Sequence, residues 1–395
     1  MKILTYTTLY PNDVQPRHGI FVEQRLRQLM DQQNIQVKVV APVPWFPSSA
    51  KRFGVYADYA RVGRQENRFG IAVYHPRYLA IPKIGMTIAP ALLAAASLPY
   101  LKKLIAEGYD FDAIDAHYFY PDGVAAAIIA KALKKPLVVT ARGTDINLIP
   151  QHALPKKMIL WAARQAGQVI TVCEALRAEM IRLSVDGEKI HTLRNGVDLH
   201  TFSPKDRSAI RMEMNLTQPT LLSVGHLIER KGHRLVIEAM RQLPDYQLLV
   251  VGNGEEKAAL QTLVAKLNLN ERVRFLGVLP HQQLTDVYNA ADALVLASSR
   301  EGWANVLLEA MACGTPVVAT SIWGTPEVVR TPEAGVLVRQ RTADSLVQGV
   351  NELFSNYPKR QDTRKYAEQF SWDDTVKGVF NVLEALISKS AHTFN

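Results

Sequence analysis

Two carboxylates stand eight positions apart, Glu301 and Glu309, in the segment SSREGWANVLLEAMACGTPVVAT. A glycine follows the first acid directly, and the residues between the two acids are largely apolar. An ionised carboxylate accepts hydrogen bonds from hydroxyl groups, so each acid could hold a polyhydroxylated part of a ligand. The apolar residues between them indicate a segment that is otherwise buried.

The same segment has the pattern of a strand, a turn and a helix. ALVLASS is interpreted as a strand leaving the core, REGW as the turn at its carboxyl end, and NVLLEAMACG as a helix ending at Gly314. The first turn of such a helix presents backbone N–H groups, which suit a phosphate. Glu309 lies one to two turns further on. A phosphate flanked by two polyhydroxylated groups is the layout of a nucleotide sugar.

Each acid also has an ordinary structural explanation. Glu301 could be an acid near the positive end of the helix macrodipole, and Glu309 could lie on a solvated helix face. Either explanation is plausible alone. Both acids together with Gly302 favour the ligand site.

Short β-rich runs alternate with helical stretches along the chain. Their continuous apolar character indicates strands covered on both faces, and the alternation predicts parallel sheets with right-handed crossovers. The predicted strands are 2–6, 37–41, 71–75, 112–116, 136–140, 168–172 and 189–193, followed by 220–224, 247–251, 272–276, 293–297, 315–319 and 335–338.

The restart of this pattern predicts an α/β chain of two doubly wound, Rossmann-like domains, 1–200 and 201–370, joined within 195–204. A capped amphipathic helix at about 371–390 is expected to pack back on the first domain. Ligands of such sheets bind at the carboxyl ends of the strands. The cleft between the two domains is therefore the expected active site.

Length and composition fit two buried cores, with 395 residues, 48% apolar and 21% charged. Cys173 and Cys313 alone exclude a disulfide framework or a cysteine zinc site, and a reducing compartment is expected. The stretch MKILTYTTLYPN is too short and polar for a signal peptide, so a cytoplasmic location is predicted.

No charged residue occurs between Ile84 and Leu101, a run of borderline length for a membrane span. Pro90 and Pro99 are expected to interrupt it. A buried helix is the favoured prediction, with a surface helix touching lipid as the alternative.

The net charge of +9 belongs to the first half of the chain. Residues 1–200 hold 25 Lys/Arg and 16 Asp/Glu, whereas residues 201–395 hold 21 of each. The excess is either a random surface bias or a sign of an anionic membrane face, an anionic acceptor or nucleic acid. No nucleic-acid motif accompanies it. We therefore expect a membrane or phosphate-bearing partner, no nucleic acid, and salt-dependent binding to anionic vesicles.

The segment EGWANVLLEAMACGTPVVA resembles the E-x7-E signature of family 4 of the retaining glycosyltransferases, which have the GT-B architecture of two Rossmann-like domains facing across a cleft. The resemblance implies that Glu301 contacts hydroxyls of the donor sugar and Glu309 contacts the nucleotide ribose. It also implies that backbone amides between them hold the diphosphate, in Gly302, Trp303, Ala304, Asn305, Val306 and Leu307.

SVGHLIERKGH (223–233) resembles the loop of that family that binds the diphosphate. Lys231 matches the family's diphosphate lysine, and Gly225 begins the loop. His226 stands where the family often has Arg, so Arg230 is expected to supply the guanidinium. Without the resemblance, the run ERK would be interpreted as a solvated charge cluster.

Four further segments resemble the family. In VVGNGEE (250–256), which has too few glycines for a dinucleotide fingerprint, Gly252 is expected on the nucleotide side of the cleft. The resemblance of DAHYFYPDG places His117 near the transferred sugar, although a lone histidine after a strand could equally be a satisfied structural one. The resemblance of QPRHGIFVEQ places Gly19 in a loop that closes on the donor. In TARGTDIN, Arg142 stands where the family has His, which adds a fixed positive charge near the acceptor.

The resemblance predicts a retaining transferase that moves a sugar from a UDP- or GDP-linked donor to a hydroxyl acceptor. The expected acceptor is a glycan or a lipid-linked precursor in bacterial cell-surface polysaccharide synthesis, met at the inner face of the plasma membrane. Closure of the cleft would bring Gly19 and His117 over the sugar. Lys231, Arg230 and helix amides would stabilise the leaving diphosphate, so no metal or other cofactor is expected.

Other classes were weighed against this prediction. A nucleotide-sugar epimerase of the same architecture is disfavoured by the E-x7-E signature, and a phosphorylase by the lack of a lysine context for pyridoxal phosphate. An NAD enzyme is disfavoured because no G-x-G-x-x-G follows the first strand. A non-catalytic binding protein is disfavoured by the number of motifs.

Overall fold

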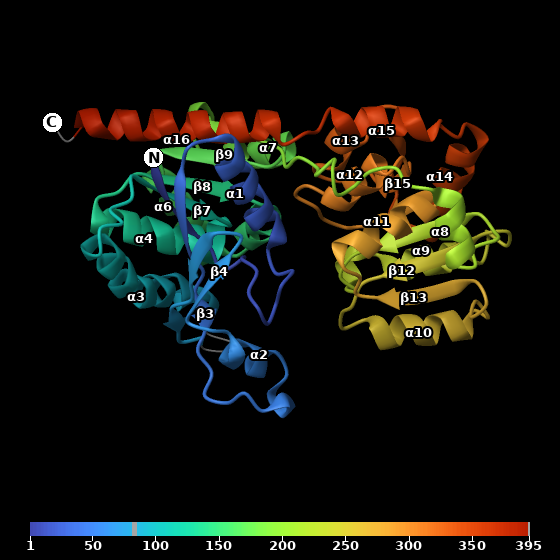
Figure 1. Cartoon of the computed structure of the whole chain (residues 1–395), viewed down its shortest axis with the longest axis horizontal. Helices are drawn as coiled ribbons and strands as arrows, with labels where there is room; N and C mark the ends of the chain where they lie inside the picture. Colours follow the sequence, from blue (N-terminus) through green and yellow to red (C-terminus); the bar gives the residue numbers. More distant parts are fainter. Residues whose placement is uncertain (81–84, 394–395) are drawn as a thin grey trace. The chain divides into compact units, whose positions relative to one another are not determined.

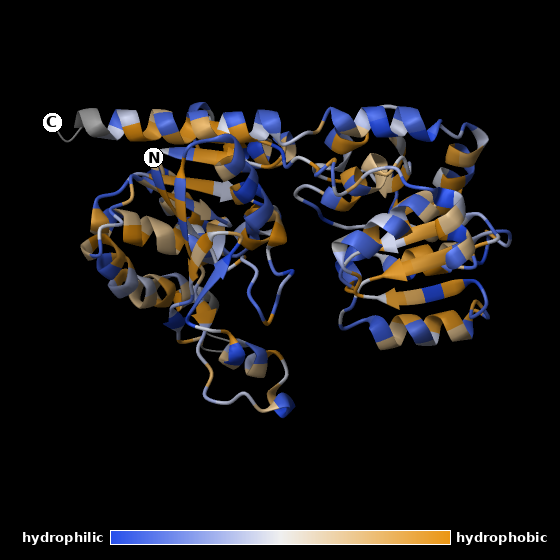
Figure 2. Cartoon of the chain, viewed as in Figure 1, coloured by the Kyte–Doolittle hydropathy of each residue, from blue (hydrophilic) through white to orange (hydrophobic). Residues whose placement is uncertain are grey.

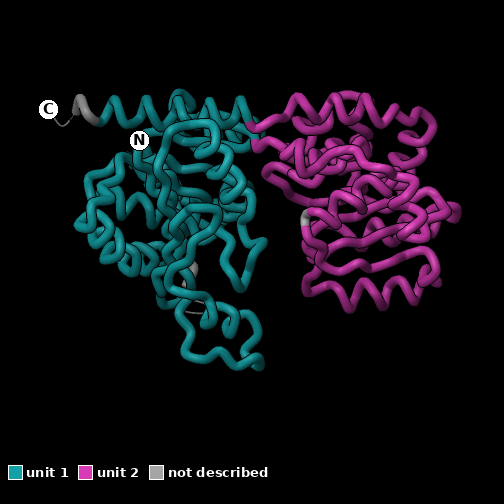
Figure 3. The backbone as a smooth tube through the Cα atoms, viewed as in Figure 1, with its two compact units in different colours: residues 1–194, 373–395 teal, residues 195–372 magenta. Residues whose placement is uncertain are grey.

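The computed structural model describes residues 1–80 and 85–393 and divides the chain into two compact units (Figure 3). Unit 1 comprises residues 1–194 and 373–395, and unit 2 comprises residues 195–372. Each unit is an α/β fold around its own mainly parallel sheet, which confirms the predicted fold class.

Unit 1 is built on an eight-stranded sheet of order β10-β9-β8-β7-β1-β2-β5-β4, in which only β4 is antiparallel to its neighbour (Figure 1). A separate pair, β3 and β6, lies beyond the carboxyl ends of β2 and β5. The strands are β1 (Lys2–Tyr6), β2 (Gln36–Val40), β3 (Val43–Pro44), β4 (Gln65–Arg68), β5 (Ile71–Tyr74), β6 (Arg77–Tyr78), β7 (Ala113–His117), β8 (Leu137–Ala141), β9 (Gln168–Thr171) and β10 (Ile190–Thr192).

Helices cover this sheet, and the C-terminal helix α16 returns to pack on α1 and β8 (Figure 1). The helical elements are α1 (Ile20–Gln32), η1 (Lys51–Phe53), α2 (Val55–Arg61), α3 (Gly85–Ala106), η2 (Phe119–Gly123), α4 (Val124–Leu133), α5 (Thr144–Asn147), η3 (Ile149–Gln151), α6 (Ala153–Gln165), α7 (Glu174–Arg182), η4 (Gly187–Lys189) and α16 (Asp373–Thr393).

Helix α3 corrects one prediction, because it runs unbroken through Pro90 and Pro99. Proline removes one N–H and frees the carbonyl four residues earlier. For Pro99 that carbonyl belongs to Ala95, and both residues lie on the exposed face, where water can satisfy it. The helix is also only partly buried: by length and composition residues 87–106 could span a membrane, and 33% of that stretch is buried. The start of the predicted run, Ile84, lies outside the described residues.

Unit 2 has a six-stranded parallel sheet of order β13-β12-β11-β14-β15-β16. Its strands are β11 (Thr220–Val224), β12 (Gln247–Val251), β13 (Val273–Gly277), β14 (Ala293–Leu296), β15 (Val317–Thr320) and β16 (Gly335–Val338). Its helical elements are α8 (Arg207–Glu213), η5 (Glu229–Lys231), α9 (His233–Ala239), α10 (Lys257–Lys266), α11 (His281–Ala290), α12 (Asn305–Ala312), α13 (Thr325–Val328), α14 (Ala343–Ser355) and α15 (Arg360–Glu368).

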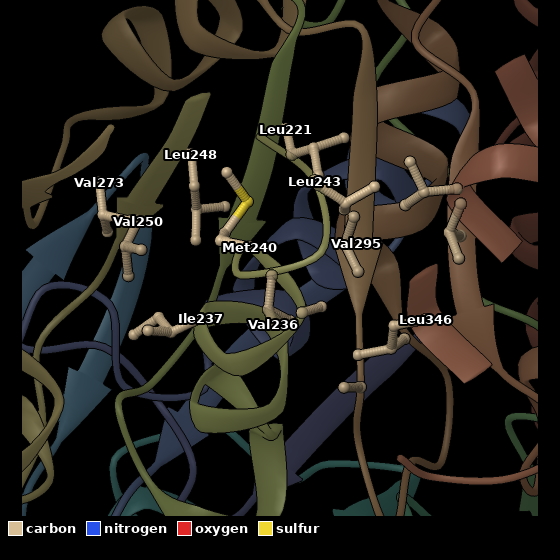
Figure 4. Packing of buried hydrophobic residues seen from close by; sticks show 14 of the residues in the cluster. Leu221, Val236, Ile237, Met240, Leu243, Leu248, Val250, Val273, Val295 and Leu346 are labelled. Atoms are coloured by element: carbon tan, nitrogen blue, oxygen red, sulfur yellow. The ribbon is translucent and has the colours of Figure 1, made fainter. Parts of the chain in front are cut away.

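Apolar side chains on both faces of the strands form the cores. In unit 2, Leu221 and Val295 from neighbouring strands pack with Ile237 and Met240 of the α9 segment and with Leu346 of α14 (Figure 4). Most strands of the two sheets are correspondingly hydrophobic, whereas β4 at the edge of its sheet is hydrophilic (Figure 2). All thirteen predicted strands are present, with ends shifted by at most two residues.

Each sheet reverses its strand order once, beside its first strand. In unit 1 the reversal falls between β1 and β7, and in unit 2 between β11 and β14. Ligands of doubly wound sheets bind where the strand order reverses, because the two loops leaving neighbouring strands there diverge to opposite faces. The residues after β11 and β14 therefore form the candidate site of unit 2.

Candidate active site

Glu301 is the centre of a cation cluster at the reversal point of unit 2. Its Oε1 atom lies 2.5 Å from Lys231 Nζ and accepts a 2.7 Å hydrogen bond from Ser298 Oγ. Its Oε2 atom lies 3.6 Å from Arg230 Nη1, which also donates to the carbonyl of Arg300. The loops after β11 and β14 thus bring together three of the residues predicted to act on the donor.

The Glu301 carboxylate is buried, with 7% of the residue exposed. Burial acts to raise its pKa, but the ammonium of Lys231 and the hydrogen bond from Ser298 outweigh it, so the pKa lies below the ordinary value. Glu301 is therefore ionised at neutral pH and is not a proton donor. Glu301 lies just before the start of α12, as the alternative explanation has it, but it is also buried and paired with Lys231.

Close backbone packing holds the two loops together. Gly232 has φ of 71°, and a Cβ atom on it would lie 2.1 Å from the carbonyl oxygen of Ala297. A side chain at this position would push the Lys231 loop away from the Glu301 loop. Arg341 links the same loops, because it donates to the carbonyls of Ala297 and Glu229 at 2.9 and 2.7 Å.

His233 supports the Lys231 loop from inside. The side chain is fully buried, with Nδ1 2.8 Å from Ser223 Oγ and Nε2 3.2 Å from the carbonyl of His226. Burial lowers its pKa to about 4, so the ring is neutral at pH 7. Sequence reasoning missed both His233 and Arg341. The histidine lies in the diphosphate-loop motif, but nothing in one sequence separates a buried histidine from a ligand.

Glu309 lies on α12 and accepts a 2.8 Å hydrogen bond from the hydroxyl of Tyr288 on α11. Burial raises the pKa of Glu309 to about 7, against the opposing effect of this hydrogen bond. Glu309 is half-buried, and the hydrogen bond from Tyr288 ties it to α11, so it is not a freely solvated side chain. Tyr288 was not predicted, because its position opposite α12 depends on tertiary packing.

Two of the backbone amides predicted to bind the diphosphate already donate hydrogen bonds within the chain. The amide of Asn305 donates to the carbonyl of Trp303, and the amide of Leu307 donates to the carbonyl of Ala304. No side chain caps α12 at Ala304. Phosphate contacts by this turn, and by Gly225 and Gly252, remain predictions. A Cβ atom on Gly252 would lie 1.8 Å from the carbonyl oxygen of Gly225, so the turns after β11 and β12 touch.

Unit 1 holds a buried ionic cluster beneath its own reversal point. Arg25 of α1 donates to both carboxylate oxygens of Asp115 on β7, at 3.2 and 3.1 Å, and to Thr140 Oγ1 on β8 at 3.0 Å. Arg25 is 2% exposed and Asp115 is fully buried. Burial acts to raise the pKa of Asp115, and the cations around it hold that pKa below its ordinary value instead.

His117 belongs to this cluster and is fully buried. Its Nδ1 atom lies 2.6 Å from Arg142 Nη2, and its Nε2 atom lies 3.2 Å from Asp115 Oδ2. Because an arginine can only donate, Nδ1 is the acceptor and Nε2 carries the proton. Burial and the two neighbouring arginines lower the pKa of His117 to about 3, so the ring is neutral. A sugar contact by His117 stays a prediction, and it would require Arg142 or Asp115 to move.

Two buried carboxylates that the sequence did not single out hold the surrounding loops. Asp122 accepts from the amide of Thr8 at 2.6 Å and from the Thr7 hydroxyl at 3.1 Å, which ties η2 to the loop after β1. Asp145 accepts from the amides of Phe119 and Gly143, both at 2.7 Å, which ties the loops after β7 and β8 together. Burial raises the pKa of both, that of Asp122 to about 7.

Gly19 should tolerate no side chain. Its φ is 68°, and a Cβ atom would lie 2.2 Å from the carbonyl oxygen of Leu9. We expect Gly19→Ala to lower the free energy of unfolding by more than the ~1–2 kcal/mol that a left-handed alanine costs by itself. Gly70→Ala is the matched control, since Gly70 has φ of 81° with nothing within 4 Å. Equal losses in urea unfolding of the two variants would contradict the close approach.

Comparison with known proteins shows to which family these motifs belong. Residues 19–201 match the model described as Glycosyltransferase Family 4, and residues 205–370 match that described as Glycosyl transferases group 1. The chain belongs to glycosyltransferase family 4. The predicted family is thereby confirmed, and the epimerase and NAD-enzyme alternatives are not favoured.

Relatives and solved structures agree with the assignment. The glycosyltransferase is 29% identical over 357 residues to TuaC of Bacillus subtilis, named as a teichuronic acid biosynthesis glycosyltransferase, which covers 89% of this chain and 88% of that protein. Sucrose-phosphate synthase from Thermosynechococcus elongatus superimposes with a TM-score of 0.79 at 20% identity, over 98% and 99% of the chains. HepE from Anabaena, in complex with UDP, superimposes with a TM-score of 0.74 at 20% identity, over 98% of this chain and 100% of that chain. These structures confirm the GT-B fold.

Proposed function

We propose that this glycosyltransferase transfers a sugar from a nucleotide-sugar donor with retention of the anomeric configuration. The observation that carries the proposal is the Glu301–Lys231 pair, at 2.5 Å, joined by Ser298 and Arg230 at the reversal point of unit 2. A fixed carboxylate suits sugar hydroxyls, and the two cations beside it suit a diphosphate. A UDP-linked donor is favoured over a GDP-linked one, because the structures of the similar HepE hold UDP and UDP-glucose.

In the proposed reaction, the bond between the anomeric carbon and the diphosphate oxygen breaks first. Lys231 and Arg230 stabilise the negative charge that develops on that oxygen, which is the usual largest contribution of such a site. The acceptor hydroxyl attacks from the same face and gives its proton to the departing phosphate. In this same-face mechanism Glu301 acts by positioning the sugar and not as a nucleophile, and Lys231 and Ser298 hold its carboxylate in place.

The stereochemistry of the product tests this proposal. The purified chain is incubated with UDP-glucose or GDP-mannose and an acceptor, with EDTA present, and the product anomer is read by proton NMR. Retention of the α configuration and activity in EDTA are the expected results, because fixed cations replace a divalent metal. An inverted anomer would reject the retaining mechanism, and loss of activity in EDTA that Mg²⁺ restores would reject metal independence.

We further propose that the acceptor is a lipid-linked or polysaccharide precursor of a cell-surface polymer, met by the enzyme at the cytoplasmic face of a membrane. The similarity to TuaC supports the polymer, and the +9 charge of residues 1–200 supports an anionic surface.

Donor binding should depend on the protonation of Glu309. Its pKa is about 7 in the free protein, and ribose hydroxyls that donate to the carboxylate favour the charged form. We expect UDP-glucose to bind about tenfold more weakly at a pH near 6 than near 8, since each pKa unit is worth about 1.4 kcal/mol. Calorimetry measures this, and UDP-glucose is the suitable ligand because its diphosphate diester does not titrate in that range.

Two variants separate Glu309 from other titrating groups. Glu309→Gln should bind with little pH dependence. Tyr288→Phe removes the hydrogen bond that lowers the pKa of Glu309, so its midpoint should move to higher pH. A pH profile unchanged in Glu309→Gln would show that another group controls binding.

A further inference from the structure

Exposed apolar side chains gather on one protruding segment of unit 1. Residues 43–64 leave the carboxyl end of β2, form β3, η1 and α2, and extend away from the sheet (Figure 1). The described residues include eleven large hydrophobic side chains classed as exposed, and four lie on this segment with a fifth beside it. These five, which we call the apolar tip, are between 37% and 53% exposed: Trp45, Phe53, Val55, Tyr56 and Leu79.

The backbone brings Leu79 to the same place as Trp45. Strands β3 and β6 pair in parallel, and the amide of Trp45 donates to the carbonyl of Tyr78 at 2.7 Å. The tip is therefore assembled from two separate stretches of the chain, one that holds Trp45, Phe53, Val55 and Tyr56 and one that holds Leu79. Both follow the carboxyl ends of neighbouring strands, β2 and β5.

The protruding segment has a defined structure. The ring of Phe46 packs 5.3 Å from both Phe53 and Tyr56, and Arg77 donates to the carbonyl of Tyr59 at 2.8 Å. Ala57 and Val62 of the same segment are buried. The segment thus has its own small core around Phe46, and Phe53 and Tyr56 pack against it while remaining 37% and 41% exposed.

Basic side chains lie on the same segment of the chain as the apolar tip. Between Trp45 and Arg64 the chain carries four Lys/Arg, all exposed, and one acid, Asp58, which is ion-paired with Arg61. Arg52 lies 5.0 Å from the ring centre of Phe53. Aromatic side chains mixed with Lys and Arg are typical of surfaces that enter the interface of an anionic bilayer, where the rings meet the acyl boundary and the cations meet phosphates.

The position of the apolar tip connects membrane binding with the proposed transfer reaction. The parallel strands of unit 1 end at one edge, so the tip and the loop that carries Gly19 leave the same edge of the sheet. We propose that the apolar tip, with Lys51 and Arg52, seats unit 1 on an anionic bilayer and turns this edge toward the lipid headgroups. The proposal deepens the function proposed above, because it rests on an acceptor held at a membrane.

Vesicle sedimentation of the full chain tests the proposal. The lipids are phosphatidylcholine alone and phosphatidylcholine mixed with phosphatidylglycerol. We expect binding only to the mixed vesicles, and a loss of about tenfold or more in Trp45→Ser/Phe53→Ser and in Lys51→Ser/Arg52→Ser. Phe69→Ser is the matched control and should bind as the wild type does. Phe69 is 62% exposed, but it lies in the β4–β5 turn, at the amino end of β5 and away from the tip.

Each other outcome contradicts the proposal. Unchanged binding by the Trp45→Ser/Phe53→Ser variant would place the contact elsewhere, and equal binding to phosphatidylcholine alone would remove the role of the anionic lipid. Concentration-dependent self-association that this variant abolishes, without vesicle binding, would assign the tip to a second copy of the chain.

UDP binding is measured in parallel and separates this proposal from the proposed function. All three variants should bind UDP normally, which shows that they remain folded. A wild type that binds vesicles but no nucleotide would reject the donor and keep the membrane contact. Normal donor turnover without vesicle binding would reject the membrane contact alone.

Discussion

Lys231→Ala is expected to lower kcat for sugar transfer by about 10²–10³-fold, the usual loss when one preorganised group that stabilises developing charge is removed. Lys231 Nζ lies 2.5 Å from Glu301 and is 15% exposed as a side chain, so its charge acts in a partly dehydrated site. KM for the donor should rise less than kcat falls, because the charge on the diphosphate is largest as the bond breaks.

Steady-state kinetics with a saturating acceptor, alongside thermal unfolding of each variant, check this result. Lys266→Ala is the control, since Lys266 is an exposed lysine at the end of α10 in the same unit. The double variant Lys231→Ala/Glu301→Gln should lose less than the product of the two single losses, because the residues interact. A kcat for Lys231→Ala within about threefold of the wild type would remove Lys231 from the proposed reaction.

Arg25→Met is expected to destabilise unit 1 by about 3–5 kcal/mol, the range for removing one partner of a buried ion pair. The substitution keeps most of the volume of the side chain but leaves Asp115 buried without its two hydrogen bonds from the guanidinium. Thermal unfolding of unit 1 should therefore begin roughly 10 °C lower. His117 and Arg142 still contact the cluster and prevent a larger loss.

The comparison variant for Arg25→Met is Asp110→Ala. Asp110 pairs with Lys135 at 2.6 Å, but its side chain is 63% exposed. A pair of this kind contributes less than about 1 kcal/mol, because water screens it. Chemical denaturation measures both variants. Similar losses for the two would mean that burial does not strengthen the Arg25–Asp115 interaction.

The sequence alone predicted the elements with local signals. Buried parallel strands are continuous apolar runs bounded by turn residues, so every predicted strand is present within two residues. The short strands β3, β4 and β6 were missed, because two to four half-exposed residues carry no such pattern. A buried helix was predicted here, and Pro90 and Pro99 were expected to interrupt the apolar run, because the sequence does not show whether the freed carbonyls face water.

In the donor site, too, some residues were predicted from the sequence and others were found only in the tertiary structure. Glu301 was predicted from its strand-turn-helix pattern, and Arg230 and Lys231 were predicted from the resemblance of their loop to the family. The structure shows that the strands before these two loops are neighbours at the reversal of the sheet. Within each motif the spacing along the chain fixes where the side chain lies. The groups that set the chemistry of these residues come from elsewhere: Tyr288, which shares a hydrogen bond with Glu309, and Arg341, which joins the two loops.

The motifs of this chain were therefore enough to determine its family, its fold class and the residues expected to hold the donor. The tertiary structure determined the protonation states and the burial of those residues. The pKa of Glu309, the neutral ring of His117 and the exposure of the apolar tip all depend on which distant segments pack against them. Burial and Coulomb interactions act through space, and one sequence records only the order along the chain.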